Sequence, residues 1–391
     1  MILELHLIQN FAPSNLNRSD TGSPKDCTFG GFRRARISSQ CFKRAMREYF
    51  RKNFSAQANI AERSTRLVEA IAKHLIENDK PEAEAKAVVE TALSGVGLKM
   101  SSKDATKTEY LIFLGREEIK SVADVCLENY DALLAITPKT KEGMTAKEAK
   151  KAAKGSVPPE ISKALQRVLD GGKASDLALF GRMLADLPDK NRDASSQVAH
   201  AISTHKVGME FDFFTAVDDL KPEDTAGSDH LGTVEFNSAC FYRYANVNVE
   251  KLMENLQGDE DLTKGTVEAF IRSAIEAIPT GKQNSFATHE KPNFVLAVVR
   301  DAGFSSMANS FETPAKEKEW NGETKQMSEG LVKNSIEKFA SHWEKVSGVY
   351  GDGAKAKNLV TTSDADLKNL NNSDAGNVET LITNTMNAIF A

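Results

Sequence analysis

The chain has few cysteines, and none lies in a metal-binding or disulfide motif. Its 391 residues include four, namely Cys27, Cys41, Cys126 and Cys240, and no two form a CxxC pair. Structural zinc sites and the disulfide frameworks of small secreted proteins need closely spaced cysteines. The scattered thiols argue against both and favour a reducing cytoplasm.

Long apolar runs and a leader peptide are also missing. No apolar stretch approaches the roughly 20 residues that cross a bilayer. The first residues, MILELH, lack the basic region of a signal peptide and alternate as a strand does. We therefore expect a cytoplasmic protein that does not bind a membrane.

Motifs of common enzymes are absent from the sequence. There is no GxSxG, and Gly281-Lys282-Gln283 lacks the other residues of a P-loop. The candidates for a metal site are His200, His205, Asp218, Asp219 and His230. The histidines of HAISTH are five residues apart and the aspartates read as a solvated loop, so a metal site is disfavoured. We expect no cofactor, no metal and no catalytic residue.

What the chain does have is a concentrated positive charge near its N-terminus. Arg18 to Lys52 contains ten Lys and Arg against three acidic residues, whereas the whole chain carries a net charge of −5. A basic block in an acidic protein is typical of a surface that binds a polyanion. The alternative is a solvated amphipathic helix after a surface loop. Gly30-Gly31 and the nearby Arg33, Arg34 and Arg36 make that alternative the weaker one.

This block divides into a loop and a helix. Residues 17–37, rich in Ser, Asp and Gly, predict a long loop in which Gly30-Gly31 would let backbone amides approach a phosphate. Ser38-Ser39 predicts a helix start. The spacing predicts a buried face of Phe42, Ala45, Met46, Tyr49 and Phe50. It predicts an opposite, wet face of Gln40, Lys43, Arg44, Arg47 and Arg51. Loop, helix N-terminus and cationic face are therefore expected to converge on one sugar-phosphate backbone.

The remaining pattern predicts an α+β fold. Leu3, Leu5 and Leu7 predict a half-buried strand with His6 on its surface. Residues 57–181 are helical by pattern, and residues 235–249 read as a central strand with apolar groups on both faces. A polar segment from Gly281 is expected to start a strand. Together these elements favour a ferredoxin-like core with a helical insertion and a protruding hairpin between about 198 and 232.

Two further clusters have both a structural and a functional interpretation. Lys147, Lys150, Lys151 and Lys154 would form one stripe on a helix, either solvated or touching phosphates without reading sequence. Phe211, Phe213 and Phe214 cannot share one strand face. They are either buried or, with Thr215 and Val217, form a wedge that unstacks bases.

Four segments together resemble the CasC-type backbone subunit of the type I-E CRISPR surveillance complex Cascade, of the RAMP superfamily. They are LNRSDTGSPKDCTFGGFRRARISSQCFKRAMR, VAHAISTHKVGMEFDFFTAVDDL, SDHLGTVEFNSACFYRYANVN and IPTGKQNSFA. The resemblance implies an RRM-like palm with helical fingers and a hairpin thumb. The expected segments are 1–56 and 235–350 for the palm, 57–181 for the fingers, 182–234 for the thumb and 351–391 for a C-terminal extension.

The resemblance also implies a function. The protein would be a non-catalytic, crRNA-binding subunit whose copies form a helical filament along the guide RNA. They would present the guide for pairing with target DNA and R-loop formation in antiviral defence. Its partners would be crRNA, target DNA, further copies of itself, other Cascade subunits and a recruited nuclease-helicase that makes the cuts.

The resemblance also implies roles for individual residues. Arg18, Lys25, Gln40 and Lys43 match RNA-backbone contacts, to which the helix face adds Arg44 and Arg47, and Lys282 and Gln283 form a second strip. Met183, Phe214, Thr215 and Val217 would hold the kinked RNA and its displaced base. Phe213 stands where the family can carry Trp. Lys147, Lys150, Lys151 and Lys154 have the spacing of the family's DNA-contacting finger helix.

Two other functions are consistent with the sequence. The first is a metal-dependent ribonuclease of a related CRISPR effector, with Asp20 or Asp26 as cleavage residues. These aspartates could instead make Asx-turns or pair with nearby arginines. The second is a single-stranded RNA-binding protein that acts alone.

Overall fold

A computed structural model describes the chain except for residues 55–58, 105, 138–156, 217–229 and 322–325. The chain divides into two compact units. The sheet unit comprises Met1–Tyr49, Ser196–Val249 and Val267–Ala391, and the helical unit comprises Phe50–Ser195 and Glu250–Thr266. The finer division into five segments, expected from the sequence, stays a prediction.

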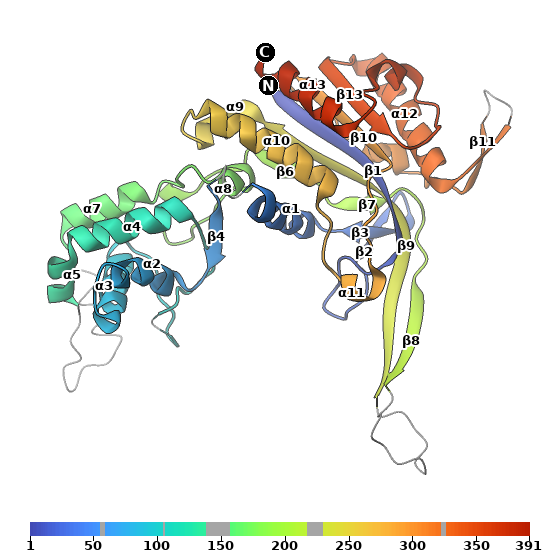
Figure 1. The fold of residues 1–391 in the computed structure, drawn as a ribbon. Coiled ribbons are helices and arrows are strands. Elements are labelled where there is room, and N and C mark those ends of the chain that lie inside the picture. The colour runs from blue at the N-terminus through green and yellow to red at the C-terminus, as the bar shows by residue number, and fades with distance from the viewer. Residues whose placement is uncertain (55–58, 105, 138–156, 217–229, 322–325) are drawn as a thin grey trace, which may run out of the picture. The chain divides into compact units, whose positions relative to one another are not determined.

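An antiparallel nine-stranded sheet forms the centre of the sheet unit (Figure 1). Its strands are β1 (Ile2–Ser14), β2 (Asp26–Phe29), β3 (Phe32–Ile37), β6 (Ser196–Val198), β7 (Ala201–Ser203), β8 (Glu210–Ala216), β9 (His230–Asn248), β10 (Phe294–Arg300) and β13 (Ala354–Thr361). The spatial order is β13-β10-β1-β9-β7-β3-β2, and β6 and β8 also pair with β9. The α+β prediction is confirmed, and the order β10-β1-β9-β7 is compatible with a ferredoxin-like core.

Helices cover both faces of this sheet. Helix α1 (Ser39–Asn53) lies on one face, where Phe42 packs with Phe11 and Phe241. Helix α12 (Leu331–Tyr350) covers the other face, where Phe339 and Trp343 join a second apolar cluster. Because β9 lies between β1 and β7 and is covered on both sides, the prediction of a central strand is confirmed.

The first strand is more deeply buried than the sequence predicts. His6 is fully buried, so the expectation that it lies on the surface is wrong. Its ring centroid lies 5.6 Å from those of both Phe339 and Trp343. Its Nδ1 is 2.9 Å from the hydroxyl of Tyr242. Alternation in the sequence shows that a strand has two faces, but not that a distant helix covers the polar one.

Glu4 lies on the same covered face and is held by several hydrogen bonds. Its Oε1 accepts from the Tyr244 hydroxyl and from the Ser305 amide, each at 2.6 Å, and its Oε2 pairs with Arg300. Burial alone would raise the pKa of Glu4, but His6 and the donors from Ser305, Tyr244 and Arg300 lower it overall. The carboxylate therefore stays charged in the core, and β1 is joined to β9 and β10 by side chains as well as by backbone.

The helical unit has its own apolar core. Its elements are β4 (Ala61–Ser64), α2 (Leu67–Ile76), α3 (Glu82–Gly95), β5 (Ile112–Gly115), α4 (Arg116–Glu128), α5 (Tyr130–Ile136), α7 (Pro159–Val168), α8 (Ser175–Phe180), η1 (Pro188–Lys190), α9 (Val249–Asn255) and the first residues of α10 (Glu260–Glu276). Buried aliphatic side chains of α2, α3, α4 and α7 form the core, among them Ile71, Val88, Val122 and Leu165.

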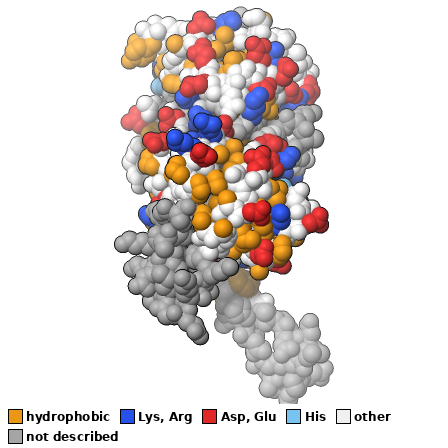
Figure 2. All heavy atoms as spheres, turned by 90° about the vertical axis from the view of Figure 1, so that its left-hand side faces the viewer, with side chains coloured by type: hydrophobic (Ala, Val, Ile, Leu, Met, Phe, Trp, Pro, Cys, Tyr) orange, Lys and Arg blue, Asp and Glu red, His pale blue; other side chains and the backbone are white. Residues whose placement is uncertain are grey.

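The pattern of residues 57–181 agrees with this unit. The residues of this range that the structure describes are mainly helical, as predicted, with the short β4–β5 pair added. On the face shown in Figure 2, apolar side chains gather between groups of charged ones. No helix among the described residues is long and apolar enough to span a bilayer.

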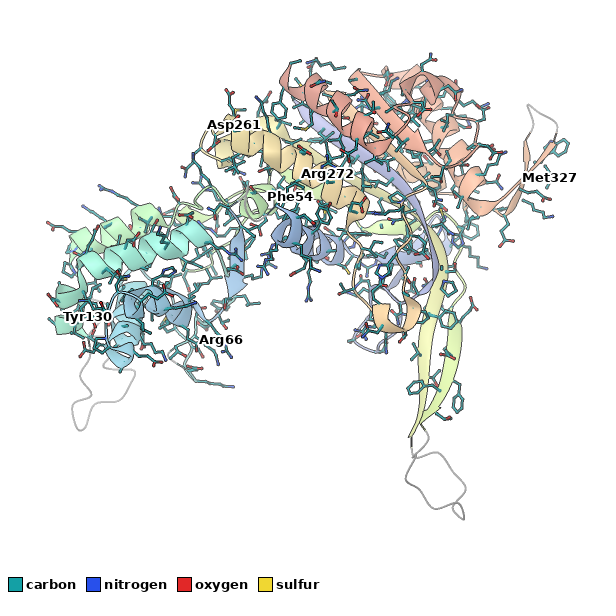
Figure 3. The ribbon with its side chains drawn as sticks, in the orientation of Figure 1. Phe54, Arg66, Tyr130, Asp261, Arg272 and Met327 are labelled. Carbon is teal, nitrogen blue, oxygen red and sulfur yellow. The ribbon has the colours of Figure 1, made fainter. Side chains whose placement is uncertain are left out.

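The rest of the sheet unit follows the second half of the chain. Its further elements are the residues of α10 from Val267 on, α11 (Gln283–Phe286), η2 (Ala308–Phe311), β11 (Lys318–Asn321), β12 (Gln326–Glu329), η3 (Lys368–Ser373) and α13 (Val378–Phe390). Arg272 of α10, labelled in Figure 3, donates to both carboxylate oxygens of Glu379 on α13, each at 2.7 Å. This bidentate pair joins the C-terminal helix to α10.

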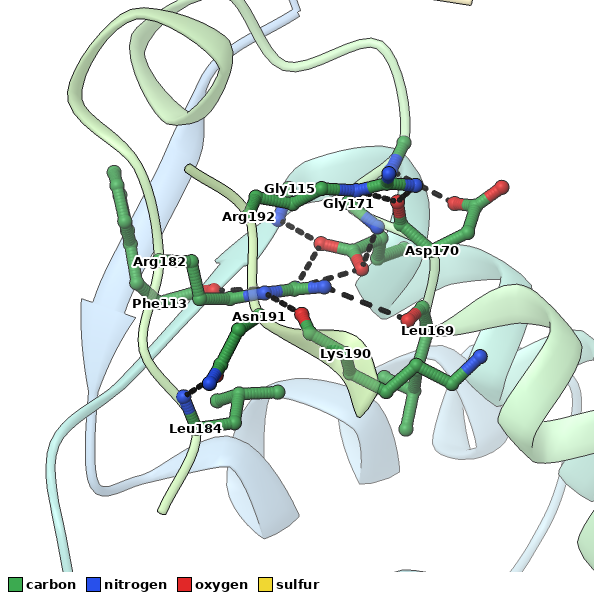
Figure 4. Close-up of polar contacts among 12 residues, drawn as sticks. Phe113, Gly115, Leu169, Asp170, Gly171, Arg182, Leu184, Lys190, Asn191 and Arg192 are labelled. Atoms are coloured by element: carbon green, nitrogen blue, oxygen red, sulfur yellow. Dashed lines mark hydrogen bonds and ion pairs between the residues drawn. The ribbon is translucent and has the colours of Figure 1, made fainter. Parts of the chain in front are cut away.

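A buried ion pair organises one end of the helical unit (Figure 4). Glu118 and Arg182 are both almost fully buried, and Arg182 Nη1 lies 2.8 Å from Glu118 Oε1. Glu118 also accepts from the amides of Gly115 and Gly171, at 2.7 and 2.6 Å. Arg182 donates further to backbone carbonyls, those of Phe113, Leu169 and Lys190. Each buried charge is thus paired, and the segment that carries Met183 is fixed at Arg182.

We predict that His6 makes the stability of the sheet unit depend on pH. Burial lowers the pKa of His6 to about 4, while Glu4 raises it and Arg300 lowers it. The folded chain therefore binds fewer protons than the unfolded chain between the unfolded value of 6.5 and about 4. The free energy of unfolding should fall by about 3 kcal/mol as the pH drops through this window. Urea denaturation at several pH values measures it.

The matched variants are His6→Gln and His289→Gln, because His289 is an exposed histidine of the same unit. The difference in unfolding free energy between wild type and His6→Gln should shrink below pH 6.5. His289→Gln should follow the wild-type curve. Parallel curves for wild type and His6→Gln would contradict a neutral, buried His6.

We also predict that Glu118→Gln strongly destabilises the helical unit. The change leaves the buried guanidinium of Arg182 without its counter-charge, which costs about 3–5 kcal/mol in comparable sites. Thermal unfolding measures the loss. Glu82→Gln, which removes an exposed partner of Lys86, is the control and should leave the melting temperature unchanged. Equal melting temperatures for the two variants would show that the buried pair contributes nothing.

Candidate nucleic-acid interface

Part of the predicted long loop is a hairpin. Residues 26–37 form β2 and β3, joined by Gly30-Gly31, whose φ angles are +60° and +81°. A two-residue turn of this kind needs both positions in the left-handed region, which glycine adopts readily. A Cβ on Gly30 would also lie 1.9 Å from the carbonyl oxygen of Glu312. The prediction of a loop is wrong here, and turn geometry with close packing explains the glycines.

The three clustered arginines have different roles. Arg34 is fully buried and donates to backbone carbonyls, those of Ser203, Phe311 and Glu312, at 2.6 to 3.1 Å. Arg33 is exposed, points to the other face of β3 and pairs with the carboxylate of Asp26. Arg36 is half-buried, and its Nη1 lies 3.1 Å from His200 Nδ1. Alternation separates Arg33 from Arg34, and burial removes Arg34 from the surface, so the three do not form one phosphate site.

Hydrogen bonds join the loop before this hairpin to the start of α1. Asn17 Oδ1 accepts from the Ser38 amide at 2.8 Å, and the Asn17 carbonyl accepts from the Lys25 amide at 2.8 Å. Arg18 forms an isolated β-bridge with Pro24. Two predicted RNA contacts, Arg18 and Lys25, therefore belong to a loop that is fixed to the N-terminus of the cationic helix.

Helix α1 has the two faces that the spacing predicts, with differences at their margins. Ala45 and Tyr49 of the expected buried face are half-buried, and Arg51 of the expected wet face is half-buried and pairs with Glu62. Phe42, Met46 and Phe50 are buried. On the other side, Gln40 and Arg44 are exposed, whereas Lys43 and Arg47 are half-buried. Burial lowers the pKa of Lys43. The structure thus brings Gln40, Lys43, Arg44 and Arg47 onto one side of α1.

An open polar cavity of about 670 Å³ lies against the loop. Its charged lining includes cations, Lys25, Arg33 and Arg36, and acids, Asp20, Asp26 and Glu235. The two aspartates named as cleavage candidates thus share one cavity, but the Asp26 carboxylate is paired with Arg33. Within the described part of the chain, no three His, Cys, Asp or Glu residues are grouped to hold a metal ion.

Arg36 and His200 lie beside the start of α1, next to the predicted RNA contacts, although the sequence analysis did not name either one as an RNA contact. Arg36 can only donate, so His200 Nδ1 accepts, and the ring proton is on Nε2. Burial lowers the pKa of His200, as do Arg36 and Lys25. His200 therefore presents an N–H donor at Nε2, and among the described residues it belongs to no group of three potential metal ligands. The basic cluster was the sequence signal for Arg36, whereas none identified His200.

The predicted second strip lies in a loop and not at a strand start. Gln283–Phe286 forms α11, flanked by Lys282 and Ala287 in the left-handed region, at φ +51° and +48°. The side-chain nitrogen of Gln283 donates to the carbonyls of Pro279 and Thr288, at 3.1 and 2.8 Å. The strand prediction is wrong because these local hydrogen bonds close the loop on itself. An RNA contact by Lys282 or Gln283 stays a prediction.

Exposed phenylalanines lie on the β8–β9 hairpin. Phe211 and Phe213 are 66% and 65% exposed, and Phe214 is 41% exposed, so ordinary burial is excluded. Phe214 pairs with Gly232, and a Cβ on Gly232 would lie 2.2 Å from the Phe214 ring. That ring therefore lies across the backbone of Gly232. Alternation places Phe213 on the opposite face of the hairpin.

The other predicted residues of the hairpin and fingers are only partly described. Thr215 is exposed at the end of β8. Met183 is 81% exposed and belongs to the helical unit, where it follows the buried Arg182. Val217 lies outside the described residues, as do Lys147, Lys150, Lys151 and Lys154.

Two solved structures are similar to the chain over its whole length. A chain of a "CRISPR RNA-guided surveillance complex, pre-nicking" has a TM-score of 0.86 and 31% sequence identity, and the match covers 100% of both chains. A chain of a "CRISPR RNA-guided surveillance complex" has a TM-score of 0.74 and 26% identity, covering 99% of this chain and 100% of the other. No curated protein matches the chain.

The family follows from a match along nearly all of the sequence. Residues 3–388 match the family described as CT1975-like protein. Together with the structural similarities, this match confirms the resemblance to CasC-type Cascade subunits. The chain belongs to the family of CT1975-like proteins.

Proposed function

We propose that the chain is a non-catalytic, crRNA-binding backbone subunit of a CRISPR surveillance complex. The observation that carries the proposal is the cationic surface of α1 and the loop joined to it by the Asn17–Ser38 hydrogen bond. The chain is also similar over its full length to a chain of an RNA-guided surveillance complex. Arg18, Lys25, Gln40 and Lys43 are the proposed backbone contacts, with Arg44, Arg47, Lys282 and Gln283 beside them.

The chemistry of this surface suits a backbone rather than a base sequence. Ammonium and guanidinium groups on a helix and its preceding loop neutralise phosphates without distinguishing bases. A guide RNA of any sequence can bind such a surface with its bases left available. Sequence specificity then comes from pairing between the guide and target DNA.

The hairpin supplies the second proposed contact. We propose that the hairpin holds the RNA where one base is displaced, through the rings of Phe213 and Phe214 together with Thr215 and Val217. Met183 of the helical unit is proposed to contact this RNA as well. Apolar side chains that enter a stack separate neighbouring bases, at a cost of a few kcal/mol for each step. Exposure of Phe213 and Phe214 supports this role, because a solvated phenyl ring gains by covering a base.

Assembly with several partners follows from the same proposal. Copies of the chain would line up along crRNA with other Cascade subunits and open target DNA into an R-loop. A recruited nuclease-helicase would make the cuts. Lys147, Lys150, Lys151 and Lys154 are the proposed contacts to duplex DNA.

The first experiment is to purify the chain with its operon partners and to sequence any bound RNA. Uniform RNA derived from a CRISPR repeat, in a large particle, is the expected result. RNA of mixed length bound to a monomer would instead favour a single-stranded RNA-binding protein that acts alone.

A ribonuclease is the second candidate, because Asp20 and Asp26 line one cavity. The pairing of Asp26 with Arg33 counts against it, since an ion-paired carboxylate is a poorer metal ligand. Cleavage of complementary RNA that requires Mg²⁺ and is lost in Asp26→Ala would favour this candidate. Intact RNA after incubation with Mg²⁺ would remove it.

We predict that Lys43→Ala weakens RNA binding by about tenfold and lowers the salt slope of the affinity by about one unit. The reason is the loss of one cation from the proposed phosphate-binding face. Titrations of labelled crRNA at several salt concentrations measure both. Lys338→Ala is the matched control, because Lys338 is a half-buried lysine of α12 in the same unit. An unchanged slope for Lys43→Ala would remove Lys43 from the interface.

We predict that Phe214→Ala spares folding but impairs the geometry of the guide. The ring covers Gly232 on the hairpin, outside the two apolar clusters of the sheet, so the melting temperature should stay close to that of wild type. Target-DNA binding by the assembled complex should weaken by about tenfold or more. Phe304→Ala removes an exposed ring elsewhere in the same unit and should change neither. Normal target binding by Phe214→Ala complexes would contradict the role.

A further inference from the structure

Asn15 lies where two proposed RNA-contacting elements meet. Its side chain is only 1% exposed and follows the pairing of β1 with β9. The side-chain nitrogen donates to the carbonyl of Gly22 and to the carbonyl of Glu235, both at 2.9 Å. Gly22 belongs to the loop between Arg18 and Lys25. Glu235 belongs to the part of β9 that pairs with Phe211 of β8, at the base of the hairpin.

The loop that contains Gly281 packs closely against the backbone at Asn15 and Leu16. A Cβ on Gly281 would lie 2.3 Å from the Leu16 carbonyl oxygen and 2.7 Å from that of Asn15. The loop that carries Lys282 therefore touches the backbone at Asn15. Phe286 of this loop also lies against Phe236 of β9, with ring centroids 5.6 Å apart.

The geometry of a short amide makes this junction rigid. Asn15 has two side-chain N–H groups, and each is directed to a carbonyl of a different segment. The two carbonyls cannot separate without leaving a buried polar group unpaired, which is unfavourable. Because Asn has a short side chain, it also has little freedom to follow either segment if that segment moves.

We propose that Asn15 is a positioning residue that sets the distance between the RNA-gripping loop and the β8–β9 hairpin. This inference rests on the proposed function. A phosphate held by Arg18 or Lys25 then lies at a fixed number of nucleotides from the rings of Phe213 and Phe214. Every copy of the chain consequently interrupts the guide at the same spacing.

The test compares two buried amides in the whole complex. Asn15→Ala removes the junction. Asn334→Ala is the matched control, because Asn334 is also 1% exposed and its side-chain nitrogen donates to two carbonyls, those of Lys316 and Glu317. Each variant is assembled with crRNA and its operon partners. Chemical probing of base accessibility along the guide, RNA affinity at several salt concentrations and the melting temperature are measured for both.

Asn15→Ala is expected to keep its RNA affinity within about threefold of wild type, because the phosphate contacts remain. The contrast between accessible and protected bases should fall by about half or more, because the hairpin no longer holds one distance from the loop. Asn334→Ala should lower the melting temperature by about as much as Asn15→Ala does. It should nevertheless keep the wild-type contrast between accessible and protected bases. If Asn15→Ala does not assemble, Asn15→Ser, which keeps a hydroxyl donor at that position, is compared with Asn334→Ser in the same way.

Two results separate this inference from the proposed function. If the pattern of accessible and protected bases along the guide shows the same contrast in wild type and in the Asn15 variant, the role of Asn15 is overturned and the proposed function stays intact. A wild-type complex without any regular pattern would overturn the proposed spacing itself. Equal loss of contrast in the Asn15 and Asn334 variants would show that general destabilisation, and not the junction, is responsible.

Discussion

The continuity of strand β9 is the constraint on which the sheet unit depends. Its residues pair with β8 from His230 to Phe236 and with β1 from Asn237 to Asn248. One strand thus carries the hairpin and occupies the centre of the sheet. A shift of register in the core would move every ring of the hairpin by the same step, and a one-residue shift would exchange its faces. The buried contacts of Glu4 with Tyr244 and Arg300 oppose such a shift, because they bind β1 to its two neighbours in one register.

The sequence was sufficient for features that depend on local pattern. The two faces of α1, the central strand β9 and the helices among the described residues of 57–181 all follow from spacing, and the structure contains them. The placement of Phe213 and Phe214 on different faces follows from a simpler argument, since neighbouring strand residues point to opposite sides. Charge and motif together were enough to locate the cationic loop and helix.

Features that depend on distant segments could not be predicted. His6 is buried because α12, more than 300 residues later in the chain, covers its face of the sheet. Arg34 was grouped with Arg33 and Arg36 by position, but its carbonyl partners come from residues 203, 311 and 312. Gly30-Gly31 looked like a phosphate-binding loop because a tight turn and an anion site use the same residue type. Asn15 gave no signal, since a single asparagine after a strand is common and only tertiary contacts give it two partners.

The position of β1 in the sheet has a consequence for folding while the chain is being synthesised. This strand lies between β9 and β10, which are made more than 200 residues later. Until then its backbone edges are open on both sides, a state that favours pairing with other chains. The non-local contacts of this sheet also make its folding slow relative to local helix formation. A nascent chain can therefore form most of the helices of residues 57–181 before β1 has either of its neighbouring strands.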